Sequence, residues 1–274
     1  MHCSLKRLRG IALLAATVGA ATVSYGQASD PAALDAVRAA VKSELQAAKT
    51  DRSTWIYTEH DTTAGKDAVY DSVETPQGTL KRLIELNGRK LTGSAEQMET
   101  QRIENYIHDS SAQAKARRAG AHDDAQATEM LKMLPDAFIW TKASESGGLL
   151  TLKYRPNPDF NPPNMQARVM STMAGEMVIS QDGDRIRSLR GRLTSNVLIG
   201  FGILGKLDRG GTFDVERRKL EGGSWQITET RVHIGGHALL FKTIGQQEDD
   251  IKTDWKPSTA HSLEDAARLL HAER

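Results

Sequence analysis

The sequence predicts an α+β protein built around one large antiparallel sheet. Apolar residues recur with a helical period in three regions only, near residues 30–49, 94–134 and 262–271. Between these regions, short segments alternate apolar and polar residues and end at tight-turn signals such as Asn87-Gly88. The segment 196–215, NVLIGFGILGKLDRGGTFDV, sets five glycines among large aliphatic residues. Because a strand pattern rather than a helix follows it, this segment indicates a bent sheet and not a phosphate-binding loop.

The first helix is expected over residues 30–49, DPAALDAVRAAVKSELQAAK. Asp30 is a suitable N-cap, and Pro31 fits the first turn because its missing N–H is not needed there. Apolar residues at steps of three and four, beginning at Leu34, place one apolar stripe on the helix.

Three strands are expected next, in RSTWIYTEH, DAVYDSVE and TLKRLIEL, and the third turns through Asn87-Gly88 into RKLT. Residues 94–134 then return to a helical period. Ser94 with Gln97 resembles a capping box, and Ala119-Gly120 divides the region into two predicted helices. The second helix, from about 122 to 134, ends before Pro135.

From Ala137 onward the pattern predicts strands again, with a hairpin loop at SESGG. RPNPDFNPPN, which holds four of the eight prolines, predicts an extended connector. Strands with tight turns, including Gly222-Gly223 and Gly235-Gly236, then form an antiparallel meander that ends before a helix over about 262–271.

Residues 1–26 read as a secretory signal peptide with a basic start and an apolar run of about 13 residues, short of the roughly 20 that span a bilayer. Cleavage after Gly26 or after Ala28 fits the small-residue rule equally well. We therefore expect one soluble domain over residues 27–274, periplasmic or secreted, and a monomer. Removing the leader's three basic residues leaves 33 Lys and Arg against 35 Asp and Glu, a formal charge of −2. This balance gives no reason to expect nucleic-acid binding.

Motifs for catalysis and cofactors are missing from the sequence. The only cysteine, Cys3, lies in the leader, and no nucleophile elbow, HExxH or P-loop occurs. If Gly235-Gly236 is a two-residue turn, His233 and His237 face opposite sides of the sheet. His122 beside two aspartates suits a helix start better than a metal site. We therefore expect no enzyme activity, no cofactor and no metal.

Arginines are concentrated in one part of the predicted meander, where seven occur within 34 residues: Arg185, Arg187, Arg190, Arg192, Arg209, Arg217 and Arg218. They could bind phosphate-bearing head groups or a polysaccharide. The ordinary explanation is that an antiparallel sheet has one solvated face, where arginine is common.

Methionines also cluster, since all those beyond the leader fall between residues 98 and 177. Flexible thioethers suit a cavity for irregular apolar ligands, although a core that uses methionine as filler explains them equally well. Together with the aliphatic residues of the glycine-rich segment, they form the predicted ligand-binding set: Met98, Met130, Met133, Met170, Met173, Met177, Leu198, Phe201, Ile203 and Leu204.

The order of elements resembles the LolA/LolB-like fold of bacterial lipoprotein sorting. The segments PNPDFNPP, ARVM, MAGEMVI, GFGILGKLDRGGTFDV and ALLFKTI are in addition similar to an uncharacterised family of secreted bacterial proteins. The resemblance implies a strongly curved antiparallel sheet, a half-barrel, with the inserted helices covering its concave face. It also implies binding of a lipid, an acylated protein or another amphiphile, with peripheral membrane contact. The alternative is an envelope protein whose sheet face binds a protein or a polysaccharide.

Overall fold

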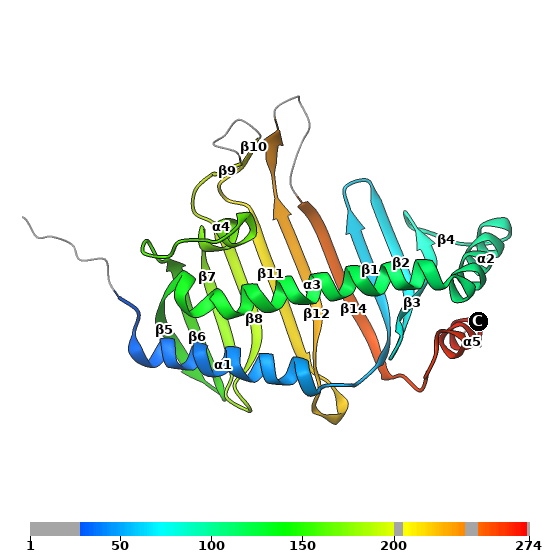
Figure 1. The fold of residues 1–274 in the computed structure, drawn as a ribbon, viewed down its shortest axis with the longest axis horizontal. Coiled ribbons are helices and arrows are strands. Elements are labelled where there is room, and N and C mark those ends of the chain that lie inside the picture. The colour runs from blue at the N-terminus through cyan, green and yellow to red at the C-terminus, as the bar shows by residue number, and fades with distance from the viewer. Residues whose placement is uncertain (1–27, 200–204, 239–245, 273–274) are drawn as a thin grey trace, which may run out of the picture.

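The computed structural model describes residues 28–199, 205–238 and 246–272. Within them the chain is α+β, and its main feature is an antiparallel sheet of 11 strands in the order β4-β3-β2-β1-β14-β12-β11-β8-β7-β6-β5 (Figure 1). The strands of this sheet are β1 (Trp55–Thr63), β2 (Lys66–Thr75), β3 (Gly78–Leu86), β4 (Arg89–Lys90), β5 (Phe138–Ser146), β6 (Leu149–Pro156), β7 (Met173–Ser180), β8 (Arg185–Leu193), β11 (Thr212–Lys219), β12 (Trp225–Ile234) and β14 (Gln246–Pro257). A separate small sheet contains β9 (Val197–Ile199), β10 (Gly205–Leu207) and β13 (Gly236–Ala238).

The described α-helices are α1 (Pro31–Thr50), α2 (Ser94–His108), α3 (Ser110–Ala137), α4 (Met165–Ser171) and α5 (Leu263–Ala272). In Figure 1, α3 crosses in front of the sheet from the α2 end to the β5 end, and α1 lies beside it over the β5–β8 end. We call the face of the sheet on which α1 and α3 lie the inner face, and the opposite one the outer face.

Two hydrophobic clusters hold the helices to the sheet. The larger joins α1, the end of α3 and α4 to β5–β8, with Val37, Trp140, Leu152 and Met177 among its fully buried side chains. The smaller packs α2 and α5 against β2 and β3 around Val73 and Leu80. The larger cluster also includes Val232 and Ile234 of β12, in the middle of the sheet.

Most predicted elements are confirmed. Asp30 caps α1 by accepting the Ala32 N–H at 3.0 Å. The three N-terminal strands, the hairpin turn at Asn87-Gly88 and the C-terminal helix are present. Asn87 and Gly88 both have positive φ, as a two-residue turn between antiparallel strands requires.

The boundary between the inserted helices was predicted wrongly. It lies at Asp109 and not at Ala119-Gly120, because the Asp109 carboxylate accepts the N–H groups of Ser111 and Ala112 and so starts α3. Likewise, α3 continues through Pro135, since the Trp140 indole donates to the Leu134 carbonyl and completes the end of the helix.

Two further predictions need correction, and one short helix was not predicted. Gly93, and not a Ser94 capping box, occupies the N-cap of α2, without a side-chain cap. The proline-rich connector leads into a short helix, α4, whose Asn164 cap accepts the Ala167 N–H. Gly235-Gly236 is not a hairpin turn of the meander, because β13 pairs with β10 in the small sheet while the end of β12 pairs with β14.

Candidate ligand-binding site on the inner face

The inner face changes from apolar to charged along single rows of paired residues. Directly paired residues of neighbouring antiparallel strands share a face, so the pairing defines each row. One row runs from β7 to β1 through Met177, Leu189, Val215, Thr230, Asp250 and Asp61. Its first three members are apolar and its last two are carboxylates.

The neighbouring row repeats this order. It runs from β8 to β1 through Gly191, Phe213, Val232, Glu248 and Thr63. The inner face therefore has an apolar half on β5–β8 and β11 and a polar half on β14, β1 and β2, with β12 at the boundary.

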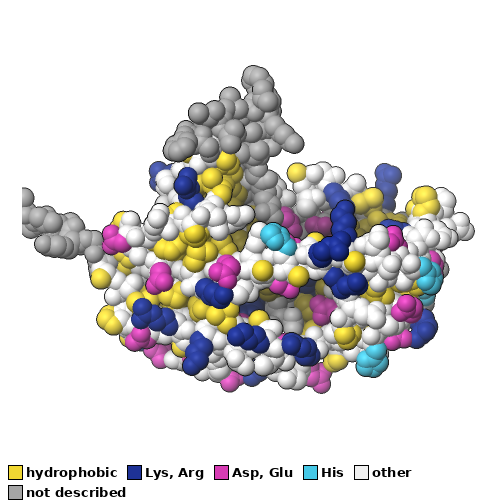
Figure 2. Space-filling model, in the orientation of Figure 1, with side chains coloured by type: hydrophobic (Ala, Val, Ile, Leu, Met, Phe, Trp, Pro, Cys, Tyr) yellow, Lys and Arg dark blue, Asp and Glu magenta, His cyan; other side chains and the backbone are white. Residues whose placement is uncertain are grey.

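Helix α3 spans both halves but packs over only one. Near its C-terminal end, Leu134 and Ala137 are buried, and Met130, Leu131 and Met133 are partly buried against the larger cluster. Residues 115–127, by contrast, are all exposed, although Figure 1 shows this part of the helix in front of the central strands. Figure 2 shows the surface hollowed beside this stretch of helix. The polar half therefore lies under a helix that does not fill the space above it.

The predicted methionine set is brought together in part. Met170, Met173 and Met177 are buried in the larger cluster, and Met130 and Met133 pack against it from α3. Two predicted residues lie apart from this cluster, since Met98 is 67% exposed on α2 and Leu198 is 48% exposed on β9. Phe201, Ile203 and Leu204 lie outside the described residues.

Beyond the middle of the sheet, the polar half contains a pocket of about 380 Å³. It lies between the inner face of β1–β3 and α2, and its lining residues are Glu59, Asp61, Tyr70, Lys81, Leu83, Glu99 and Arg102. Helix α2 forms one wall because Glu99 accepts the backbone N–H of Leu83 at 2.8 Å while Arg102 donates to the carbonyl of Lys81. These bonds also satisfy backbone groups of β3 that are not paired with β4.

Ion pairs neutralise much of the charge in the pocket. Lys81 Nζ lies 2.5 Å from Glu59 Oε1, and Arg102 binds both oxygens of Glu99 at 2.7 Å. Lys66 donates to the Tyr70 hydroxyl at 2.7 Å and lies 3.5 Å from Asp61. The pairs place both signs of charge along the pocket wall.

Two buried carboxylate oxygens on this side of the sheet have no hydrogen-bond partner among the described residues: Glu59 Oε2 and Asp250 Oδ1. They come from adjacent strands, because Asp61 of β1 pairs with Asp250 of β14. Burial, together with the negative charges of Glu74, Glu59 and Asp250, raises the pKa of Tyr57 far above its usual value. The electrostatic potential at the Tyr57 hydroxyl is therefore negative. The same side of the sheet has two carboxylate oxygens without a hydrogen-bond partner among the described residues.

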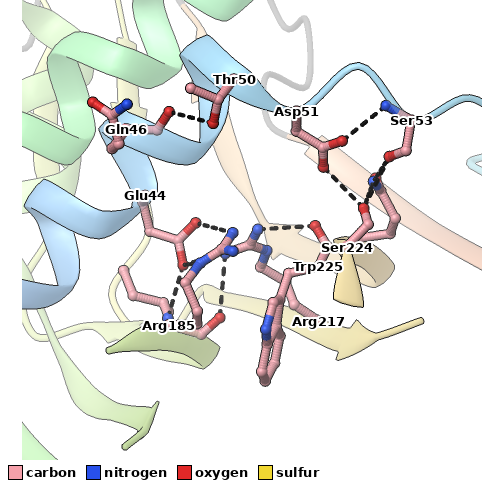
Figure 3. Close-up of polar contacts among 11 residues, drawn as sticks. Glu44, Gln46, Thr50, Asp51, Ser53, Arg185, Arg217, Ser224 and Trp225 are labelled. Carbon is pink, nitrogen blue, oxygen red and sulfur yellow. Dashed lines mark hydrogen bonds and ion pairs between the residues drawn. The ribbon is translucent and has the colours of Figure 1, made fainter. Parts of the chain in front are cut away.

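At the other end of the site, Glu44 anchors α1 to the sheet (Figure 3). Its carboxylate accepts Arg185 Nε at 3.0 Å and Nη2 at 2.9 Å, lies 2.6 Å from Arg217 Nη1, and accepts the Ile186 N–H at 2.8 Å. Burial alone would raise the pKa of Glu44, but the two arginines outweigh it and hold that pKa below its usual value. Arg185 and Arg217, two of the seven clustered arginines, therefore hold α1 against the sheet through Glu44.

A second, open hollow of about 640 Å³ borders this anchor, with Asp51, Ser53, Arg185 and Ser224 among its lining residues. Its polar groups bind one another: the Asp51 carboxylate accepts the Ser53 N–H and the Ser224 hydroxyl, as drawn in Figure 3. We consider it a weaker candidate, because these groups already have partners.

On the outer face, charged residues of alternating sign lie side by side across six strands. The row contains Lys153, Glu176, Arg190, Asp214, Arg231 and Asp249. Arg190 is paired with Asp214 and Glu216, and Arg218 with Glu229. This part of the arginine cluster is a solvated face whose charges are largely balanced.

Two of the histidines singled out in the sequence, His122 and His233, have ordinary partners. His122 lies 2.8 Å from the Gln126 side chain on exposed α3, and His233 lies 2.9 Å from Asp249 on the outer face. Among the described residues, no group of three or more His, Cys, Asp and Glu side chains is arranged to hold a metal ion.

Comparisons of the chain with protein-family models, with curated proteins and with solved structures found no match. The LolA/LolB-like resemblance therefore stays a prediction. In the part of the chain that the structure describes, no helix is both long and apolar enough to cross a bilayer.

Sequence reasoning missed the polar half of the site. Glu59, Asp61, Asp250 and Lys252 look like the solvated residues of any alternating strand, and only the pairing of β1 with β14 brings them together. One signal was available. Trp55, Tyr57, Glu59 and Asp61 occupy every second position of one strand, so the two carboxylates lie on the same face as the two aromatic residues, which predicts charge on a buried face.

Proposed function

We propose that this protein binds a lipid, an acylated protein or another amphiphile and carries it without chemical change. The observation that supports this most is the row from Met177 to Asp61, which passes from apolar to charged residues beneath one helix. An amphiphile has the same order of groups, an apolar chain joined to a polar head.

In this proposal the apolar chain lies along Leu189, Phe213 and Val215, which are only partly buried and lie beside the methionine-rich cluster. Each methylene removed from water contributes about 0.8 kcal/mol. Methionine adapts its shape readily, so Met130 and Met133 of α3 can shift as the chain enters. The head group then lies over the polar half, near Asp250.

The proposal includes the half-barrel arrangement that the resemblance implies, with a strongly curved sheet and the inserted helices over its concave face. Helix α3 would act as the lid, since its stretch 115–127 is exposed and is not held down by packing. The proposal also places the mature chain, residues 27–274, in the periplasm or outside the cell, where a carrier would meet membranes peripherally.

The alternative is an envelope protein that binds a protein or a polysaccharide through its sheet face. This has less support, because Arg190, Arg218 and Arg231 of the outer face already have carboxylate partners. The inner face offers unpaired polar atoms, whereas the outer face offers mainly paired charges.

Native mass spectrometry of residues 27–274, purified from a bacterial periplasm and followed by organic extraction and lipid analysis, tests the proposal. We expect a stoichiometric adduct that extraction releases as a phospholipid, a fatty acid or an acylated peptide. A clean apo mass that is unchanged after incubation with lipid micelles would contradict the carrier function and favour the interaction protein.

A pair of variants locates the bound chain. Val215→Asn places a polar amide in the apolar half, whereas Ile251→Asn makes the same kind of change on the outer face, where Ile251 pairs with Glu229. We expect the first variant to lose most of the adduct and the second to keep it. Equal adducts in the two variants would show that the ligand lies elsewhere.

A further inference from the structure

We propose that the polar half of the inner face holds a primary ammonium group of the ligand, with Glu59 Oε2 and Asp250 Oδ1 as its acceptors. This rests on the proposed function, because it assigns the head group of the amphiphile. It specifies a class of ligand, one with an ethanolamine-like or other primary amine head.

Two carboxylates of like charge face each other on the polar half of the inner face. Asp61 and Asp250 lie directly opposite each other on β1 and β14 and point to the same face. Two carboxylates in this position repel each other, which destabilises the pairing of their strands. Lys66 lies 3.5 Å from Asp61 and Lys252 lies 2.6 Å from Asp250, and a further cation between the two carboxylates would reduce the repulsion that remains.

In each of Glu59 and Asp250, one carboxylate oxygen has a lysine partner and the other has none among the described residues. Lys81 takes Oε1 of Glu59, and Lys252 takes Oδ2 of Asp250 at 2.6 Å. The remaining oxygen of each carboxylate is buried and has no partner among the described residues. The Glu59 side chain is only 6% exposed, so solvent does not readily satisfy its free oxygen. Both free atoms can only accept, and the group that completes them must therefore donate.

The pocket beside Glu59 is large enough for an ammonium group and has a lining suited to one. Glu59 lines the pocket of about 380 Å³, which is much larger than a single water molecule. The Tyr70 ring, which also lines the pocket, already has Lys66 Nζ at 5.2 Å and Lys81 Nζ at 6.0 Å from its centre, so this wall of the pocket accommodates positive charge. An ammonium group offers three donors on one positive centre, so it can satisfy two anionic acceptors at once, which a neutral hydroxyl cannot do.

The raised pKa of Tyr57 agrees with this assignment. After burial, its causes are the charges of Glu74, Glu59 and Asp250, which means that these carboxylates create a negative potential at the Tyr57 hydroxyl. A cation that enters here gains from the same potential.

The test compares three phospholipids with identical dihexanoyl chains and different heads: phosphatidylethanolamine, phosphatidylcholine and phosphatidylglycerol. Calorimetric titration of mature protein, residues 27–274, is done below the micelle concentrations of the lipids. We expect the ethanolamine lipid to bind at least about tenfold more tightly than the other two, because choline has the charge without N–H donors and glycerol has donors without the charge.

Two adjacent aspartates of β14 provide matched variants. Asp250→Asn removes a charge from the inner face, and Asp249→Asn removes one from the outer face. We expect Asp250→Asn to abolish the preference for ethanolamine and Asp249→Asn to retain it. If circular dichroism shows that Asp250→Asn is unfolded, Glu59→Gln replaces it, because this variant removes the other proposed acceptor charge and keeps the shape of the side chain. We expect it to abolish the preference for ethanolamine.

The outcomes separate the two proposals. Equal binding of all three lipids by the unmodified protein would overturn the ammonium site and leave the carrier function standing. A preference for ethanolamine that survives both Asp250→Asn and Glu59→Gln would also overturn the site. Binding of none of the three lipids would overturn the ammonium site, and the native mass spectrum would then decide separately whether the protein carries another amphiphile.

Discussion

Arg185 of β8 donates two parallel hydrogen bonds to the buried carboxylate of Glu44 on α1, from Nε at 3.0 Å and from Nη2 at 2.9 Å. Bidentate pairs of this kind fix geometry as well as adding energy. Arg217 approaches the same carboxylate from β11. Through these contacts, one side chain of α1 holds two strands that contribute to the apolar half of the inner face.

Replacing Glu44 should therefore destabilise the fold strongly. We expect Glu44→Gln to lower the free energy of unfolding by about 3 kcal/mol, because it leaves the mostly buried guanidinium groups of Arg185 and Arg217 without a counter-charge. Urea unfolding measures this change. The matched control is Glu129→Gln, whose salt bridge to Lys132 is well exposed and contributes no more than about 1 kcal/mol. A similar loss in both variants would contradict a structural role for the Glu44 anchor.

Glu44 should also make stability depend on pH. Because the folded-state pKa of Glu44 is lowered, the carboxylate contributes stability that is fully present above its unfolded value, near 4.5, and is lost as pH falls through the lower folded value. We expect the free energy of unfolding to fall with acid more steeply in the unmodified protein than in Glu44→Gln. Parallel pH profiles of the two proteins would show that the anchor does not titrate as described.

The glycines at the apolar end of the sheet are predicted to be irreplaceable. A Cβ on Gly175 would lie 1.9 Å from the Arg190 carbonyl oxygen, which is backbone and cannot move aside. We expect Gly175→Ala to cost at least about 3 kcal/mol or to prevent folding, measured by thermal unfolding. Gly120→Ala on α3 is the control, since nothing lies within 4 Å there and alanine should stabilise the helix by about 0.5–1 kcal/mol. If Gly175→Ala folds with unchanged stability, β7 and β8 must lie further apart at this position than the structure shows.

If α3 is the lid, ligand should protect its exposed part from exchange with solvent. We expect the amides of residues 115–127 to exchange faster than those of the buried end around Leu134 in the free protein. Adding dihexanoyl phosphatidylethanolamine should slow exchange in residues 115–127 and leave α1 unchanged, as measured by hydrogen–deuterium exchange. Protection confined to α1 or to the outer face would place the ligand away from α3.

The leader predicts the N-terminus of the mature protein. Expression of residues 1–274 in a bacterium should yield a periplasmic protein that begins at Gln27 or at Ser29, by N-terminal sequencing. A chain that keeps Met1 and sediments with membranes would instead indicate an anchor.

Local sequence signals predicted much of the fold correctly. Asp30 with Pro31 marked the start of α1, and Asn87-Gly88 marked a hairpin. The errors arose where a nearby alternative was overlooked: Asp109 caps a helix more effectively than Ala119-Gly120 interrupts one. Stop signals also failed at Pro135, because Trp140 supplies a partner for the end of the helix.

The candidate site was predicted less completely. The methionines of the central region share one hydrophobic cluster with α1, except for exposed Met98, and their role in binding a ligand stays a prediction. The polar half was not foreseen, because a carboxylate on an alternating strand has the same local pattern whether its face is solvated or lies under a helix.

By itself, the sequence determined the α+β class, the Asp30 cap of α1 and most hairpins, since each depends on residues close together in the chain. The tertiary structure alone decided that β1 pairs with β14, and hence that Asp61 faces Asp250. It also decided that Glu44 turns inward to Arg185. The physical reason is the register of the strands: a shift of one residue would move every side chain to the other face, and register between distant strands follows from packing of the whole sheet.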